Sequence, residues 1–183
     1  MKAECDAFGW GPCEDPVRRL DLVLRLARRN FEEQSGGPFA AAVFRMDTWE
    51  LIAAGVNRVV PSSCSAAHAE IVALTLAQQF YGTFDLGAAN LPAHEIAVSW
   101  RPCAMCFGAL PWSGVRSLLI AGSGDEMERL TGFDEGPIHP RWQDELAQRG
   151  IAVQHGPTQA EAVALFRDFA ASGALVYNGR RGG

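Results

Sequence analysis

Residues 95–121 read EIAVSWRPCAMCFGALPWSGVRSLLIA, and this stretch decides the fold that we predict for the chain. Glu95–Ser99 and Val115–Ala121 are apolar runs typical of buried strands, and Cys103–Trp112 between them has the pattern of a helix. A strand, a helix and a strand in succession predict a sheet that helices cover on both faces.

The chain before this unit adds a hairpin and two further helices. Asp15 followed by Pro16 is a typical helix start, because Asp caps the first turn and Pro fits its first position. A short polar stretch over residues 47–50 fits a hairpin turn between two apolar runs. The predicted elements are an irregular arm over residues 1–14, a helix from Pro16 to the breaker at Ser35–Pro38, strands over Phe39–Met46 and Leu51–Val56, and a helix over Ala66–Tyr81.

The chain after this unit begins with a long irregular region and ends with a helix and a tail. Thr158 is followed three residues later by Glu161, which is the spacing of a capping box at a helix start. The predicted elements are irregular chain over Gly122–His139, a helix from near Pro140 to before Gly150, a strand over Ile151–Gln154, a helix over Thr158–Ala171 and a tail over residues 173–183. The whole pattern predicts one α/β domain over residues 1–183.

The composition is that of an ordinary globular protein. The chain has 183 residues, of which 48% are hydrophobic and 20% charged, and its formal net charge is −5. This acidic balance disfavours a large nucleic-acid interface, because phosphate binding needs a basic face. No apolar run approaches the ~20 residues that span a bilayer, and the N-terminus shows no secretory signal. We therefore expect a cytoplasmic protein without membrane contact.

Two short segments carry the chemistry of a metal site. They are His68-Ala69-Glu70 and Pro102-Cys103-Ala104-Met105-Cys106, and each lies at a predicted helix start. Imidazole nitrogen and thiolate sulfur are ligands that zinc favours, and three protein ligands leave a fourth position for water. The spacing of the two cysteines places both sulfur atoms on one side of a helix, where the helix N-terminus favours thiolates.

Other polar residues near these two segments or of the same types are not predicted to bind the metal. Glu70 lies two residues after His68, so its carboxylate can approach water at the metal without being a ligand. The other histidines, His94, His139 and His155, lack comparable partners, and we interpret them as surface or capping residues. An odd number of cysteines in a reducing compartment favours ligands or buried thiols over disulfides.

A lone C-x-x-C pair or a lone His-x-Glu is weak evidence for any function. Together, at two helix starts that follow strand signals, they form the signature of zinc deaminases, in which the glutamate acts as general acid and base. We therefore predict a zinc-dependent hydrolytic deaminase in which His68, Cys103 and Cys106 hold one Zn²⁺ and Glu70 is the proton shuttle.

These residues resemble the cytidine deaminase superfamily over most of the chain, from about Gly37 to Tyr177. The resemblance implies a three-layer α/β/α sandwich around a five-stranded mixed sheet, and a dimer or larger oligomer. Within the superfamily, the chain resembles bacterial guanine deaminases, including members that accept aminotriazines such as ammeline. The finer resemblance is carried by Pro38-Phe39-Ala40, Asn57-Arg58, His68-Ala69-Glu70, residues 102–109, Trp112–Arg116 and Gly132–Gly136.

The resemblance also implies roles for residues outside the metal segments. Phe39 stacks on the base and Asn57 hydrogen-bonds it, and Ala69 belongs to the substrate contacts. Either Asp134 or Glu135 meets the amino-bearing edge of the base, with Glu135 as a second proton shuttle. A buried carboxylate only accepts hydrogen bonds, so it suits the donor edge of guanine.

Several positions are compatible with more than one role. Trp112 lies at the end of the metal-bearing helix, and three roles are compatible with this position: it lines the pocket, it lies in the core, or it forms a dimer interface. Tyr177 lies in a tail that caps its own pocket or reaches a neighbouring subunit. Trp100 and Arg101 stand where relatives often carry a small or aliphatic residue and an acid, so the rim of the pocket differs from theirs.

The resemblance therefore implies hydrolytic deamination of guanine to xanthine and ammonia by a homodimer that acts on a small nucleobase. A tRNA adenosine deaminase shares the motifs, but the acidic balance and the lack of a Lys/Arg-rich terminal helix disfavour it. A zinc-bearing interaction module without catalysis is disfavoured by the intact Glu70 and the open fourth ligand position. Ammeline offers a similar amino edge, and the sequence does not show whether the pocket admits a ribose.

Overall fold

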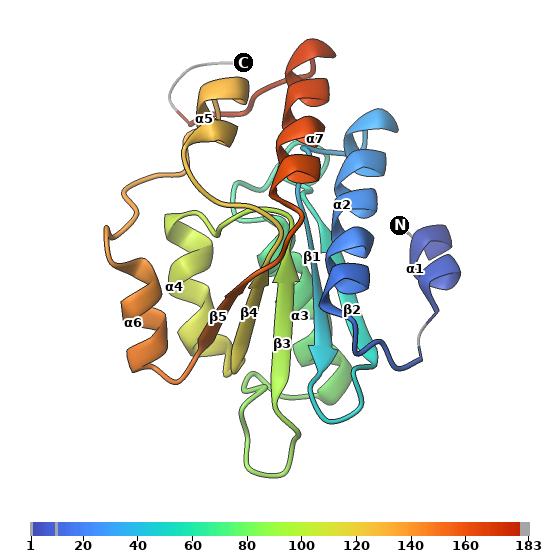
Figure 1. Cartoon of the computed structure of the whole chain (residues 1–183), viewed down its shortest axis with the longest axis vertical. Helices are drawn as coiled ribbons and strands as arrows, with labels where there is room; N and C mark the ends of the chain where they lie inside the picture. The colour runs from blue at the N-terminus through green and yellow to red at the C-terminus, as the bar shows by residue number, and fades with distance from the viewer. Residues whose placement is uncertain (1, 10, 180–183) are drawn as a thin grey trace.

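The computed structural model describes residues 2–9 and 11–179, and a five-stranded sheet lies at its centre (Figure 1). The strands are β1 (Ala40–Arg45), β2 (Leu51–Val56), β3 (His94–Val98), β4 (Ser117–Ile120) and β5 (Ala152–His155). They lie in the order β2-β1-β3-β4-β5. β1 pairs antiparallel with β2 and β3, whereas β3, β4 and β5 are parallel. The sheet is mixed, as predicted.

Helices cover both faces of this sheet, which confirms the predicted three-layer sandwich. The helices are α1 (Lys2–Phe8), α2 (Pro16–Glu32), α3 (Ala69–Tyr81), α4 (Ala104–Ser113), α5 (Glu126–Thr131), α6 (Trp142–Gln148) and α7 (Gln159–Ala171). Figure 1 shows α2 and α7 on one face, where they share a buried cluster with the sheet. α3, α4 and α6 contribute to a second cluster on the other face. Within the described residues, no helix has the length and apolarity needed to cross a membrane.

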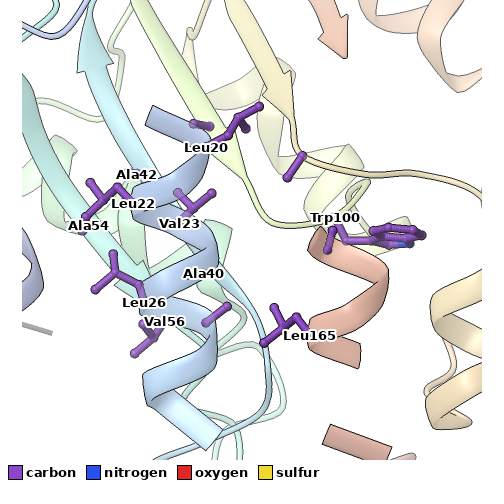
Figure 2. Close-up of a cluster of buried hydrophobic side chains, with 14 of the residues drawn as sticks. Leu20, Leu22, Val23, Leu26, Ala40, Ala42, Ala54, Val56, Trp100 and Leu165 are labelled. Atoms are coloured by element: carbon purple, nitrogen blue, oxygen red, sulfur yellow. The ribbon is translucent and has the colours of Figure 1, made fainter. Parts of the chain in front are cut away.

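The strand β1 is buried on both faces because its residues are small or apolar. Ala40 and Ala42 belong to the cluster beneath α2, whereas Ala41 and Val43 belong to the cluster beneath α3. This alternation is the two-residue period of a strand. Figure 2 shows Leu22 of α2 among the small side chains of β1 and β2, which let the helix lie close to the sheet.

Gly55 in β2 fixes the position of α3, which carries part of the candidate site. A Cβ atom at Gly55 would lie 2.5 Å from the carbonyl oxygen of Ala69 and 2.5 Å from the amide nitrogen of Ala73. Glycine leaves room for this close approach of two backbones. The first turn of α3, which follows His68, is therefore held against the sheet.

The predicted irregular arm over residues 1–14 is wrong for Lys2–Phe8, which form α1. Cys5 and Phe8, spaced three residues apart, are both buried, and the Phe8 ring packs edge-on against Phe44 with centroids 6.1 Å apart. Tertiary packing of one helical face outweighs the composition of the segment. Residues 1 and 10 of the predicted arm lie outside the described residues.

Two further predictions are corrected in the C-terminal half. The region over residues 122–139 is not wholly irregular, because it contains α5, whose Met127 is buried and whose C-terminus is set by Gly132 in a left-handed conformation with φ 79°. The hydroxyl of Thr158 donates to the carbonyl oxygen of Ala121 at 3.2 Å instead of capping α7. That bond ties the start of α7 to the chain just after β4.

His94 is buried in β3, where the sequence analysis predicts a surface or capping residue. Its Nδ1 atom lies 3.0 Å from the carbonyl oxygen of Leu86, and its ring packs edge-on against Tyr81. The loop after α3 covers this end of the sheet, and no local sequence signal reveals that contact.

Candidate active site and metal centre

The residues that the sequence analysis assigns to a metal meet at the N-terminal ends of α3 and α4. His68 immediately precedes α3, Cys103 immediately precedes α4, and Cys106 lies in the first turn of α4. Their ligand atoms all lie within 4.8 Å of one another. The Sγ atom of Cys103 is 3.4 Å from Nδ1 of His68, so the imidazole and the sulfur atoms face a common point.

The surroundings of Cys103 stabilise a negative charge on its sulfur. Its Sγ accepts a hydrogen bond from the backbone amide of Cys106 at 3.5 Å, as expected at a helix N-terminus. The thiol of Cys106 and the ring of His68 also donate to it and lower the pKa of Cys103 to about 4, although burial opposes the shift. The same thiol–thiolate bond and burial raise the pKa of Cys106.

This donor set fits zinc. One imidazole and two thiolates are among the ligand sets of catalytic zinc sites, which keep a fourth position open. Zinc binding displaces the proton that Cys106 holds, because the thiolate is the ligand form. Mg²⁺ and Ca²⁺ prefer oxygen ligands, so this set suits them poorly. His68, Cys103 and Cys106 would together hold one Zn²⁺ ion.

A cavity of about 360 Å³ lies beside the metal residues. This volume suits a small heterocycle. Most residues that the sequence analysis assigns to the site line this cavity, namely Phe39, Asn57, His68, Ala69, Glu70, Cys103, Asp134, Glu135 and Tyr177. Cys106 is fully buried in the first turn of α4.

Glu70 is a buried carboxyl group in the first turn of α3. Burial and the charge of Cys103 raise its pKa to about 7, although His68 acts in the opposite direction. A carboxyl group with a pKa near neutral pH can both accept and release a proton. The place and the protonation of Glu70 therefore suit the role that the sequence analysis gives it.

The loop between α5 and α6 turns Glu135, and not Asp134, into the interior. Asp134 is exposed, and its Oδ1 accepts a hydrogen bond from the amide of Gly136 at 2.9 Å. The carbonyl oxygen of Glu135 accepts from the amide of Ala104 at 2.9 Å, which ties the loop to α4. Glu135 is only 8% exposed, and burial together with the nearby charge of Cys103 raises its pKa to about 8.

Aromatic side chains form one wall of the cavity. The ring of Phe39 packs edge-on against Phe133 with centroids 5.2 Å apart, and it lies 5.5 Å from the ring of Phe166 in α7. Phe133 also lies 4.9 Å from the ring of Tyr177. These contacts hold Phe39 and Tyr177 from several sides, so the wall is built from rings of fixed orientation.

The C-terminal tail reaches the cavity and is tied to the loop that carries Glu135. The side-chain oxygen of Asn178 accepts from the amide of Asp134 at 3.0 Å, and its nitrogen donates to the carbonyl oxygen of Gly132 at 2.7 Å. The sequence analysis missed Asn178, because no spacing signal links residues this far apart in the chain. Residues 180–183 of the predicted tail lie outside the described residues.

Asn57 presents the donor side of its amide to the cavity. Its Oδ1 accepts hydrogen bonds from the backbone amides of Gly37 at 3.4 Å and Val59 at 3.3 Å. Its Nδ2 has no protein hydrogen-bond partner within residues 2–9 and 11–179, and Asn57 lines the cavity. The amide therefore suits a ligand that accepts a hydrogen bond, such as a carbonyl oxygen.

Trp112 does not line the cavity. It lies near the end of α4, is 84% exposed and borders a separate groove with Phe107. Within one chain, the structure therefore does not bring Trp112 to the predicted substrate contact. At the rim of the cavity, Trp100 is buried, and Arg101 forms an ion pair with Glu128 at 2.7 Å.

Comparisons with known proteins agree with this description of the site. Residues 15–121 match the family model of the cytidine and deoxycytidylate deaminase zinc-binding region. The guanine deaminase of Bacillus subtilis is 30% identical over 132 residues, which cover 72% of this chain and 80% of that protein. The tRNA-specific adenosine deaminase of Rickettsia typhi is 26% identical over 104 residues, which cover 57% of this chain and 66% of that protein.

Solved structures show the same similarity. NE0047 in complex with 2,6-diaminopurine is 51% identical with a TM-score of 0.85, and the match covers 92% of this chain and 88% of that chain. The guanine deaminase from Nitrosomonas europaea is 52% identical with a TM-score of 0.84, and the match covers 87% of each chain. The cytidine deaminase-like fold that the sequence analysis predicts is therefore confirmed.

The fold and the metal centre together define a zinc-dependent hydrolytic deaminase, which confirms the enzyme class predicted from the sequence. The chain belongs to the cytidine and deoxycytidylate deaminase family, whose zinc-binding region spans more than half of its 183 residues. The predicted zinc cofactor is confirmed by that family match and by the grouping of the three ligand residues.

Removing one sulfur ligand is expected to abolish zinc retention. Cys106→Ser replaces a fully buried thiol by a hydroxyl, which binds zinc far more weakly than a thiolate does. Zinc per chain, measured by atomic emission after dialysis, should fall from about one to near zero. Cys64→Ser, which changes an exposed cysteine, should keep its zinc. Equal zinc contents in the two variants would contradict the ligand assignment.

Glu135 is expected to destabilise the metal-free protein at alkaline pH. Its pKa rises from the ordinary value of 4.5 to about 8 on folding, so the folded state binds more protons between these values. The contribution of Glu135 to the free energy of unfolding is therefore fully present below pH 4.5 and is lost as the pH rises through about 8. Glu135→Gln removes this loss.

Calorimetry of the zinc-stripped variant checks this sign. Glu135→Gln should raise Tm at about pH 8.5 by at least ~3 °C, which corresponds to ~1 kcal/mol for a chain of this size. The gain should be smaller at about pH 5, where Glu135 is protonated in the folded state. A gain that is larger at the acidic pH would show that the carboxyl group does not titrate in this way.

Proposed function

We propose that the chain converts guanine to xanthine and ammonia. The observation that carries the proposal is the pairing of an amide donor, Asn57, with a buried carboxyl group, Glu135, in the cavity beside the metal ligands. Guanine has a carbonyl oxygen that accepts hydrogen bonds, next to N–H and amino groups that donate them. The similarity to the guanine deaminases of Bacillus subtilis and Nitrosomonas europaea supports this substrate.

Each cavity residue has a proposed part in holding the base. Asn57 donates to the carbonyl oxygen of guanine, and Glu135 accepts from its amino edge. The ring of Phe39 stacks on the base, supported from behind by Phe133 and other aromatic residues. Ala69 lines the same cavity and completes the substrate contacts, whereas the exposed carboxylate of Asp134 at its rim accepts from the amide of Gly136 and orders the loop. The base is therefore fixed by one aromatic face and by two polar groups of opposite hydrogen-bonding character.

The proposed reaction uses two carboxyl groups for proton transfer. Zinc, when held by its three ligands, supplies a Lewis acid that makes water acidic enough to react near neutral pH. A carboxylate oxygen of Glu70 takes a proton from the attacking water and delivers it to the ring nitrogen. After the carbon–oxygen bond has formed, protonated Glu135 gives its proton to the amino group and the carbon–nitrogen bond breaks to release ammonia. The new hydroxyl group then returns a proton to Glu135 as the second carbonyl group of xanthine forms. Both pKa values lie close enough to neutral for these transfers.

We also propose that the tail caps the cavity of its own chain and that residues 1–183 form one catalytic domain. Tyr177 and Asn178 line the cavity, and Asn178 bonds the loop beside Glu135. The phenol of Tyr177 lies close to Gly37, where an added Cβ would be 2.7 Å from its oxygen. A capped cavity excludes bulk water from the reaction and leaves little room for a sugar on the base.

An ammonia-release screen with zinc-loaded protein tests the proposed substrate. We expect the highest turnover on guanine, with ammeline as the next candidate because its amino edge is similar, and little turnover on guanosine. Glu70→Gln should retain zinc and lose about a thousandfold of the guanine activity. Glu161→Gln, at an exposed glutamate of α7, is the matched control and should keep full activity.

Three outcomes of these measurements would overturn all or part of the proposal. A fully active Glu70→Gln variant would remove the proton shuttle from the mechanism. Turnover of adenosine in tRNA without turnover of guanine would assign the chain to the tRNA adenosine deaminases, which share its motifs. Zinc without turnover on any aminopurine, aminopyrimidine or aminotriazine would favour a non-catalytic zinc module.

We propose that the chain forms a homodimer through an apolar surface on α3, α4 and the loop after α3. Five large apolar side chains are exposed there, namely Leu76, Phe80, Phe84, Met105 and Trp112. The end of α4 lies beside that loop, because the amide of Leu86 donates to the carbonyl oxygen of Ser113 at 2.8 Å. A surface rich in exposed aromatic residues is typical of interfaces, and a second copy can cover it across a two-fold axis.

A charge placed in this surface is expected to break the dimer. Trp112→Glu buries a carboxylate against the partner, so the molar mass measured by light scattering after gel filtration should fall to that of one chain. Val17→Glu, at an exposed apolar residue of α2, is the control and should leave the mass unchanged. A wild-type protein of monomer mass at high concentration would refute the interface.

We propose that this activity belongs to purine base metabolism in the cytoplasm. None of the five cysteines, all of which lie in the described residues, forms a disulfide, and this is typical of proteins in a reducing compartment. Guanine and xanthine are both purine bases, so the proposed reaction links two members of one metabolite class.

A further inference from the structure

We propose that Asn30 is a positioning residue for base recognition, because its side-chain amide holds the two backbone segments that orient Asn57. The inference rests on the proposed function for the identity of the base. Asn30 lies in the last turn of α2, is 4% exposed and does not line the cavity. It would therefore act on the substrate only through Asn57.

The side chain of Asn30 is fully used by its neighbours. Its Nδ2 donates one hydrogen bond to the carbonyl oxygen of Gly37 at 2.8 Å and one to the carbonyl oxygen of Asn57 at 2.9 Å. Its Oδ1 accepts from the hydroxyl of Ser35 at 3.1 Å. With both amide hydrogens and the oxygen engaged, the side chain has a single orientation.

Asn30 holds Gly37 and Asn57, and Gly37 is one of the two residues whose backbone amides orient the side chain of Asn57. The amide nitrogen of Gly37 donates to Oδ1 of Asn57, and Asn30 binds the carbonyl oxygen of each residue. A shift between the two segments would break the bond from Gly37 and leave the amide of Val59 as the remaining donor to Oδ1 of Asn57, so the side-chain amide would be held less firmly. The donor that faces the cavity is therefore fixed from the core side by Asn30.

The chain between these segments has no room to adjust. An added Cβ at Gly36 would lie 1.9 Å from the carbonyl oxygen of Asn57 and 2.6 Å from Nδ2 of Asn30. The guanidinium of Arg58 donates to the carbonyl oxygen of Ser35 at 2.7 Å and ties the same two segments a second time. The contact is thus closely packed as well as hydrogen-bonded, which favours a single geometry.

Packing alone does not explain a polar residue at this position. Asn30 follows Leu26 and Ala27 at the helical spacing of one face, and both of these side chains are in the apolar core. A buried amide is costly unless all its polar atoms are paired, and here the partners belong to the recognition segment. The position therefore serves the geometry of Asn57 rather than the contact between α2 and the sheet.

A double-mutant cycle with guanine tests this assignment. Asn30→Ser is expected to lower kcat/KM about tenfold, because Asn57 no longer holds its donor in place. In the Asn57→Ala background, the same change should have little further effect, since the group that Asn30 positions is gone. Leu22→Ala, about two turns earlier in α2, is the control; it removes core contacts but should leave kcat/KM within about twofold well below its Tm.

The side-chain NMR signals of Asn57 supply a readout that needs no substrate. In zinc-loaded wild type they should be a sharp pair, and in Asn30→Ser they should broaden or shift while Leu22→Ala leaves them in place. If Asn30→Ser does not fold, Ser35→Ala replaces it: this change removes the hydroxyl that Oδ1 and the backbone carbonyl oxygen of Asn30 share, and it should shift the Asn57 signals by a smaller amount in the same direction.

The outcomes separate this inference from the proposed function. A wild-type protein without guanine turnover would refute the proposed function. The double-mutant cycle would then be measured with the best substrate of the ammonia-release screen. If the screen finds no substrate, the NMR signals of Asn57 alone decide the role of Asn30. Two results would show that Asn30 has a structural role only. One is that the fold-decreases in kcat/KM of the Asn30 and Asn57 variants multiply fully in the double variant. The other is that the Asn57 signals are unchanged in the folded Asn30 variant.

Discussion

The contact between the Cys103 sulfur and the ring of His68 joins two residues that are 35 positions apart in the chain. It exists because α3 and α4 both begin at the same edge of the sheet. Gly55 allows α3 to lie against β2, and β3 leads directly into the segment that precedes α4. The amide of Cys106 then stabilises the thiolate, so a metal site follows from the placement of two helix N-termini.

The same closeness makes the site costly to fold. Glu70 and Glu135 are buried near a thiolate, which raises both pKa values and makes their charged forms unfavourable. Zinc offsets this cost by adding positive charge where the negative groups gather. The aromatic wall around Phe133 contributes apolar burial next to the acids. The burial that makes the charged forms of these acids unfavourable thus also brings their pKa values close to neutral, which suits the proton transfers that we propose for them.

The features that the sequence predicts correctly are those that depend on the spacing of residues within short segments. The strands around residues 95–121 and the ligands His68, Cys103 and Cys106 follow from periodicity and from helix-start signals, and the structure agrees. The sequence does not predict α1 or the buried His94, because their burial depends on segments far away in the chain. Asn178 is missed for the same reason. Side-chain direction after a turn is also hidden, so only the structure separates Asp134 from Glu135.

The fixed amide of Asn57 gives the proposed recognition a graded selectivity. Rotating the amide would turn its NH₂ group toward the amides of Gly37 and Val59, which are donors themselves. A base with an amino group in place of the carbonyl therefore meets a donor that cannot turn away. One unpaired donor costs about 1–3 kcal/mol, or roughly 5- to 150-fold in affinity. That is a preference and not an exclusion, which agrees with the 2,6-diaminopurine complex of the similar protein NE0047.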